Sequence, residues 1–167
     1  MYFKNSILVA MSGIILGIAI AIVFGVNEDL FKNKIEKGIL LNPKYSKIEN
    51  KNEFLKKEAS KNWRYYQRFH FHASAIGTMS LALLLLINFT SAPGIRKKVL
   101  CPILAISGFL YPFVWLFAGI YGPEWGRTEA KEFFAVFGYM GGVYLVTIIW
   151  VFIEVVKTEK FLTKIKS

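Results

Sequence analysis

The 167-residue sequence is poor in cysteine, histidine and charge, with one cysteine, two histidines and 19% charged residues. A single cysteine cannot form a disulfide within its own chain, which excludes a small secreted module held together by disulfides. Soluble domains carry about a quarter charged residues, whereas apolar residues here reach 54% and the mean hydropathy is +0.42. This composition excludes a disordered chain and an ordinary soluble enzyme, and it indicates a polytopic membrane protein.

Four long segments contain almost no charged residues, at about 6–26, 69–89, 99–121 and 133–156. The first has no charge over 21 residues, and as a helix it would span about 31 Å, close to the thickness of the hydrocarbon layer. The sequence therefore predicts an all-α integral membrane protein, a four-transmembrane-helix bundle that forms one membrane domain over residues 1–167. Pro112 lies in the middle of the third span and is expected to kink it.

The only sizeable polar region lies at about 27–68, between the first two spans, and it holds eleven Lys or Arg and six acidic residues. Asn27 is a suitable cap for a short helix, with Glu28 and Asp29 in its first turn. A further helix is expected to begin near Asn52 and to continue into the second span. The predicted structure is a basic, partly helical loop on the bilayer surface, where its cations contact anionic lipids. The net charge of +10 is therefore assigned to lipid contact and topology rather than to nucleic acid.

Topology follows from the even number of spans, which places both termini on one side of the membrane. The link at 90–98 and the tail after the fourth span lie on that side, and both are short and strongly basic. Because basic segments remain on the cytoplasmic side, we expect both termini in the cytoplasm and the chain in the inner, cytoplasmic membrane of the cell.

Both histidines, His70 and His72, lie at the start of the second span. Ionisable groups within a membrane are costly and mark functional sites by default. His70 shares a helix face with small residues, which suits close packing or a flat cofactor. Three uses are considered: ligation of haem or another metal, copper binding by both imidazoles with a further ligand, and a hydrogen bond to a quinone. The alternative is an interfacial role at the level of the lipid head groups.

Three further residues are candidates for cofactor contacts. Tyr111 and Trp115 belong to an aromatic third span that could form a wall against a porphyrin or quinone, and the alternative is an aromatic belt facing lipid. Arg127 lies in the turn before the fourth span and suits a carboxylate partner, with a solvated turn as the alternative.

Two function classes therefore remain open, and the residues do not decide whether the chain is an enzyme. The first is a haem- or metal-binding redox-associated subunit that takes part in electron transfer, with haem b or copper as cofactor and its site near the membrane surface. The second is an accessory or assembly subunit of a larger membrane complex, with no cofactor of its own. Small-xxx-small pairs, Gly13 with Gly17 and Gly138 with Gly142, favour close helix contacts. The expected partners are other membrane subunits or further copies of the chain.

Overall fold

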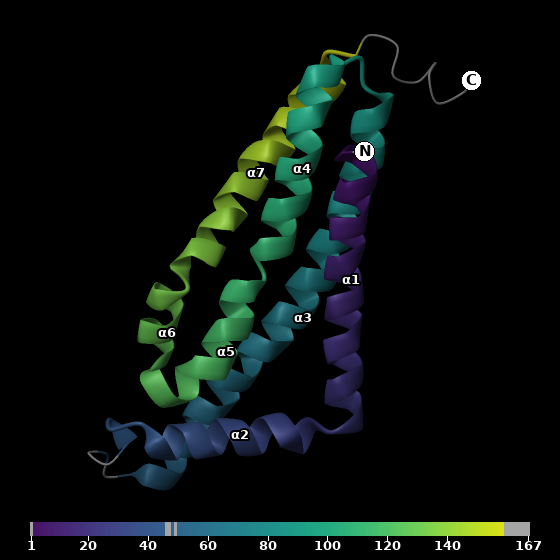
Figure 1. Ribbon diagram of the computed structural model, residues 1–167. Coiled ribbons are helices and arrows are strands. Elements are labelled where there is room, and N and C mark those ends of the chain that lie inside the picture. Colours follow the sequence, from purple (N-terminus) through teal and green to yellow (C-terminus); the bar gives the residue numbers. More distant parts are fainter. Residues whose placement is uncertain (1, 46–47, 49, 159–167) are drawn as a thin grey trace.

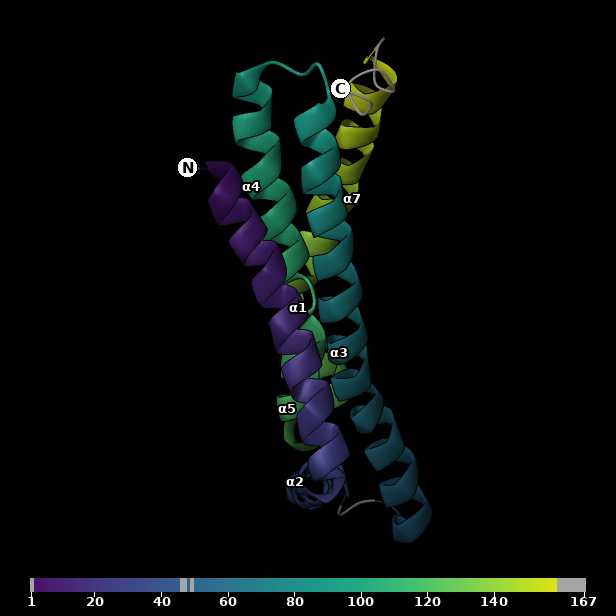
Figure 2. The same cartoon turned by 90° about the vertical axis from the view of Figure 1, so that its right-hand side faces the viewer.

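The computed structural model describes residues 2–45, 48 and 50–158, and within them the regular structure is helical. Helices α1, α3, α4 with α5, and α7 run side by side along the long axis, and α2 crosses one end of the bundle (Figures 1 and 2). The helices are α1 (Tyr2–Val26), α2 (Glu28–Leu41), α3 (Lys51–Phe89), α4 (Gly94–Leu110), α5 (Phe113–Trp125), α6 (Arg127–Phe133) and α7 (Ala135–Val156).

The prediction of an all-helical chain with several long apolar helices is confirmed. Four helical stretches are long and apolar enough to cross a membrane: α1, α3, α4 with α5 as Gly94–Trp125, and α7. The start of α1, the link between α3 and α4 and the end of α7 lie at one end of the bundle, while α2 and the α5–α6 turn lie at the other (Figure 1). The second end is called the α2 end below.

Helix α2 begins where the sequence predicts. The Asn27 side-chain oxygen accepts a hydrogen bond from the Leu30 backbone N–H at 3.0 Å, which satisfies one free donor of the first turn. Ile35 and Ile39 are buried in a cluster with Tyr66 of α3. The apolar face of α2 therefore packs on the end of the bundle, and this contact fixes the position of a helix that the sequence placed only on the bilayer surface.

Helix α3 begins at Lys51, next to the predicted start at Asn52, and continues without interruption to Phe89. Its 39 residues correspond to a length of about 58 Å. The prediction that this helix continues into the second span is confirmed, and residue 69, the expected start of that span, lies inside the helix. Residue 69 marks only a change in composition along one continuous helix.

The third span is interrupted, whereas the fourth is one continuous helix. Helix α4 ends at Leu110 and α5 begins at Phe113, as expected from Pro112, which has no N–H to donate and is bulky against the preceding turn. The predicted fourth span, 133–156, corresponds to α7, which begins at Ala135 and ends at Val156. The short helix α6 precedes it and ends at Phe133, and the sequence contains no proline at this break.

Glycines on α1 and α3 bring these two helices close together. A Cβ added at Gly17 would lie 2.8 Å from the Ser74 backbone nitrogen, and one added at Gly77 would lie 3.0 Å from the Ala10 carbonyl oxygen. On α7 the tight position is Gly141, because an added Cβ there would lie 2.8 Å from Cδ2 of Tyr111. A Cβ added at Gly142 would meet no described atom within 4 Å. The small face of α1 thus packs inside the bundle, whereas Gly142 faces outward.

Candidate functional site

The structure directs the two histidines toward different helices. Nδ1 of His70 lies 2.8 Å from the Gly17 carbonyl oxygen in α1. Nδ1 of His72 lies 2.8 Å from the Arg68 carbonyl oxygen, one turn earlier in α3. Because residues two apart on a regular helix point roughly in opposite directions, α3 does not bring the two imidazoles together.

Each of these two hydrogen bonds determines which ring nitrogen of the histidine is available to bind a ligand. A carbonyl oxygen only accepts, so Nδ1 must carry the hydrogen in each histidine. In the neutral ring the lone pair is then on Nε2. Bonds from Nδ1–H to a backbone carbonyl are also the usual way in which proteins orient an imidazole that binds a metal through Nε2. For His72 this leaves Nε2 as the possible ligand atom.

His72 faces the aromatic residues that the sequence singled out. Its ring centroid lies 5.5 Å from that of Tyr111 and 6.0 Å from that of Trp115. The Arg68 guanidinium carbon lies 4.9 Å from the Trp115 ring centroid, within the range of a cation–π contact. These four residues, Arg68, His72, Tyr111 and Trp115, are called the His72 face below. It combines a free imidazole nitrogen, two aromatic rings and a cation.

One polar group on the His72 face has no partner. The indole N–H of Trp115 is buried and meets no acceptor among the described residues. Buried donors are almost always hydrogen-bonded, and an unpaired one calls for an explanation such as a bound molecule. The face therefore offers one acceptor nitrogen, one buried donor and one positive charge to a ligand.

The histidines lie deeper along the bundle than their position in the sequence indicates. His70 contacts α1 at Gly17, nine residues before α1 ends at Val26. At 1.5 Å per residue this is about 14 Å from that end of α1. The sequence placed both histidines at the beginning of a span. The long continuous α3 places them instead beside the middle part of α1.

Arg127 lies apart from the His72 face, at the α2 end. Its Nε donates to Oε2 of Glu58 at 2.7 Å, and Lys61 binds the same carboxylate at 3.0 Å. Burial is the largest single influence on the pKa of Arg127 and lowers it, but the interactions with Glu58 and Tyr65 together outweigh burial, so its pKa lies above the usual value. Tyr65 lies close enough to raise the pKa of Arg127, and its ring stacks on Trp115 with centroids 5.8 Å apart.

Sequence reasoning missed Glu58 as the partner of Arg127. The only available signal was that both residues were expected at the same end of the bundle. Pairing between residues 69 positions apart depends on how the α5–α6 turn lies on α3, which the sequence pattern does not give.

The described residues contain no group of three or more His, Cys, Asp or Glu side chains that could hold a metal ion. A copper site formed by both histidines and a third ligand is therefore not assembled within this part of the chain. Haem needs only one or two protein ligands, so a single histidine is enough in number for that group.

No family model, curated protein or solved structure shows significant similarity to the chain. The functional argument therefore comes from the geometry of the site.

Proposed function

We propose that the chain is an integral membrane protein with four spans and that its function is to bind haem b through His72 as a redox-associated subunit. The four long apolar helices support insertion. Large apolar side chains on the outer surface also support it, for example Ile15 and Phe152, which are 63% and 66% exposed, because lipid covers such side chains in a membrane protein. The inner membrane and cytoplasmic termini remain our proposal for location, based on the short basic segments.

The depth of His72 is the observation that carries the proposed function. With α1 as a span, His70 and His72 lie near the middle of the hydrocarbon layer rather than among the head groups. An ionisable side chain at that depth is costly and marks a functional site by default. His72 is the better ligand of the two because its ring faces the aromatic residues of α4 and α5, whereas His70 is packed against α1.

The side chains of the His72 face have distinct roles in this proposal. The Arg68 carbonyl holds His72 through Nδ1 and leaves Nε2 for the iron, and Tyr111 and Trp115 would provide flat apolar contacts. The Arg68 cation and the Trp115 N–H suit the carboxylates at one edge of a haem. When bound, the haem supplies a one-electron iron couple. A further protein ligand to the haem would come from another copy of the chain or another membrane subunit.

An absorption spectrum tests this proposal. The full-length protein is purified in detergent, its spectrum is recorded in the oxidised form and after reduction with dithionite, and its iron and copper contents are measured on the same sample. We expect a Soret band and near-stoichiometric iron. His72→Ala is expected to lose most of the haem, while His70→Ala keeps it. His70 is a matched control, since it lies on the same helix and makes the same kind of Nδ1 bond. A folded, colourless and metal-free protein, or equal loss in both variants, contradicts the proposal.

One observation favours the second function class, an accessory subunit without a cofactor. The outward-facing Gly142 lies in an apolar groove of about 470 Å³ between α4 and α7, which Leu100, Tyr139 and Trp150 also line. Small residues on an open face let another transmembrane helix approach closely. Under this alternative, Gly142→Leu removes a co-purifying membrane subunit, and both histidine variants behave like the wild type.

A further inference from the structure

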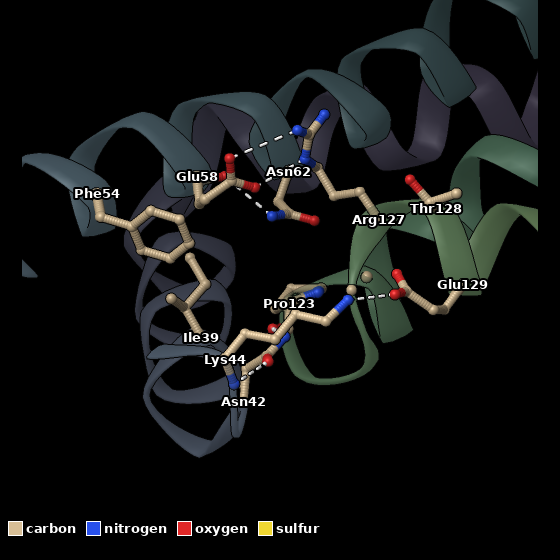
Figure 3. Close-up of a pocket in the computed structure, with 12 residues that line it drawn as sticks. Ile39, Asn42, Lys44, Phe54, Glu58, Asn62, Pro123, Arg127, Thr128 and Glu129 are labelled. Carbon is tan, nitrogen blue, oxygen red and sulfur yellow. Dashed lines mark hydrogen bonds and ion pairs between the residues drawn. The ribbon is translucent and has the colours of Figure 1, made fainter. Parts of the chain in front are cut away.

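A cavity of about 240 Å³ lies at the α2 end, between the end of α2, the polar part of α3 and the α5–α6 turn. Figure 3 shows its walls, with Glu58 and Asn62 on α3 across from Lys44 and Pro123. The cavity is separate from the His72 face. Asn62 precedes His72 by ten residues in α3, which corresponds to about 15 Å along the helix.

Asn62 gives the cavity an unpaired acceptor. The residue is 1% exposed, and its Nδ2 donates to the Glu58 carbonyl oxygen at 2.9 Å. Because that carbonyl only accepts, the amide orientation is fixed, and the oxygen is the free end. Oδ1 is buried and has no donor among the described residues. A buried acceptor without a donor is unfavourable, so a bound group that donates a hydrogen bond here stabilises the structure.

Gly122 has no side chain and packs against this oxygen. A Cβ added at Gly122 would lie 2.8 Å from Asn62 Oδ1, closer than the two groups can approach. In Figure 3 the Asn62 amide lies on the cavity wall, with its oxygen on the side of Arg127. Asn62 and Gly122 both line the cavity, so a group bound against Gly122 lies next to Oδ1.

The charges on the cavity walls are balanced. Glu58 pairs with Arg127, and Lys44 pairs with Glu129. Two acids and two bases favour a ligand that carries both charges over one with a net charge. The Lys44–Glu129 pair is about half exposed on each side, and such surface pairs contribute little to stability. It can therefore open to admit a ligand, while the more buried Glu58–Arg127 pair forms the fixed wall.

We propose that this cavity binds a small zwitterion with a primary ammonium and a phosphate, the phosphoethanolamine group. The ammonium donates to Asn62 Oδ1 and lies near Glu58, and the phosphate accepts from Lys44 and Arg127. The group has two sources, the head of phosphatidylethanolamine or a free soluble molecule. The lipid source rests on the proposed membrane insertion, but neither source involves His72 or haem.

Comparison of two lipids on the wild-type protein tests the ammonium contact. Full-length protein is stripped of lipid in detergent, and its melting temperature is measured against added phosphatidylethanolamine or phosphatidylcholine. The trimethylated ammonium of phosphatidylcholine has no N–H to donate to Oδ1. We expect a saturable rise of several degrees with phosphatidylethanolamine only, because a ligand that binds the folded state stabilises it. Equal shifts with both lipids, or no shift with either, overturn the proposal.

Variants locate the binding in this cavity. Asn62→Leu removes the acceptor, and Asn52→Leu makes the same change at an exposed position of the same helix. We expect at least a tenfold loss of affinity for phosphatidylethanolamine in Asn62→Leu and none in Asn52→Leu. Gly122→Ala fills the space beside Oδ1 and is expected to give the same loss, so the test stands even where Asn62→Leu does not fold. Unchanged affinity in Gly122→Ala overturns the proposal.

Free phosphoethanolamine distinguishes the two sources. If free phosphoethanolamine at millimolar concentration competes with phosphatidylethanolamine for binding, the cavity recognises the soluble group. If the rise in melting temperature with phosphatidylethanolamine persists in its presence, the cavity recognises the membrane lipid. The haem spectrum of Asn62→Leu is recorded in parallel. We expect it to match the wild type, so a failure at this cavity is distinguishable from a failure of the haem proposal.

Discussion

Nδ1 of His70 donates a hydrogen bond to the Gly17 carbonyl oxygen at 2.8 Å, and this bond joins α3 to α1 at a point where the two helices are closely packed. The small residues around His70 suited either a flat cofactor or close helix packing. In the structure α1 covers that face with Gly13 and Gly17. The space that a cofactor would need beside His70 is therefore filled by a helix, and His72 is left as the histidine with an open ring face.

Gly17→Leu is predicted to destabilise the protein. A Cβ at this position would lie 2.8 Å from the Ser74 backbone nitrogen, and a backbone atom cannot move aside as a side chain can. We expect a loss of about 1–3 kcal/mol in unfolding free energy, typical of overpacking, measured by denaturant unfolding in detergent. Gly25→Leu is the control, because an added Cβ there meets no described atom within 4 Å. Equal stability of the two variants would contradict the close α1–α3 packing.

Gly141→Ala and Gly142→Ala are predicted to differ although they are neighbours. A Cβ at Gly141 would lie 2.8 Å from Tyr111 Cδ2, whereas one at Gly142 points into open space. Because the Tyr111 ring also contacts His72, Gly141→Ala should displace the ring and change the near-ultraviolet circular dichroism, with about 1 kcal/mol or more lost. Gly142→Ala should leave both the spectrum and the stability of the isolated protein unchanged. A larger effect of Gly142→Ala than of Gly141→Ala would show that a different face of α7 packs against the bundle.

Arg96→Ala is predicted to cost more stability than Glu154→Gln. The Glu154 side chain is 5% exposed and lies 3.0 Å from Arg96, whose side chain is 47% exposed. Removing Arg96 leaves a buried carboxylate without its cation, while Glu154→Gln keeps an acceptor for the Trp150 indole N–H and leaves Arg96 able to reach water. We expect about 1–3 kcal/mol for Arg96→Ala and less for Glu154→Gln. A double-mutant cycle on unfolding free energies measures the pair, and a coupling near zero would exclude a stabilising contact.

Gly126→Ala is predicted to disturb the turn that positions Arg127. Gly126 has φ +108°, a value found at no other described residue and rarely adopted by residues with a Cβ. An added Cβ would also contact the Glu129 carboxylate. We expect a loss of about 1–3 kcal/mol, measured by thermal unfolding. Gly94→Ala, where an added Cβ meets no described atom within 4 Å, should be neutral, and a neutral Gly126→Ala would show that the turn relaxes without strain.

Local chemistry made several parts of the structure predictable. Asn27 followed by two acids marks the start of α2, and Pro112 marks the break between α4 and α5, because a cap and a missing N–H act within one helical turn. The sequence also brought Tyr111 and Trp115 into the candidate site, and the structure places both against His72. It did not separate the roles of the two histidines, since that depends on which neighbouring helix each one meets.

The sequence by itself determined the helical class, the long apolar helices and the break at Pro112, because hydrophobicity, caps and prolines act locally along the chain. Only the tertiary structure decided that α1 covers His70, that His72 faces Tyr111 and Trp115, and that Glu58 pairs with Arg127 beside the unpaired Asn62 oxygen. These relationships join residues up to 69 positions apart. They depend on the rotation and depth at which each helix packs against its neighbours, and close packing of particular side chains sets both.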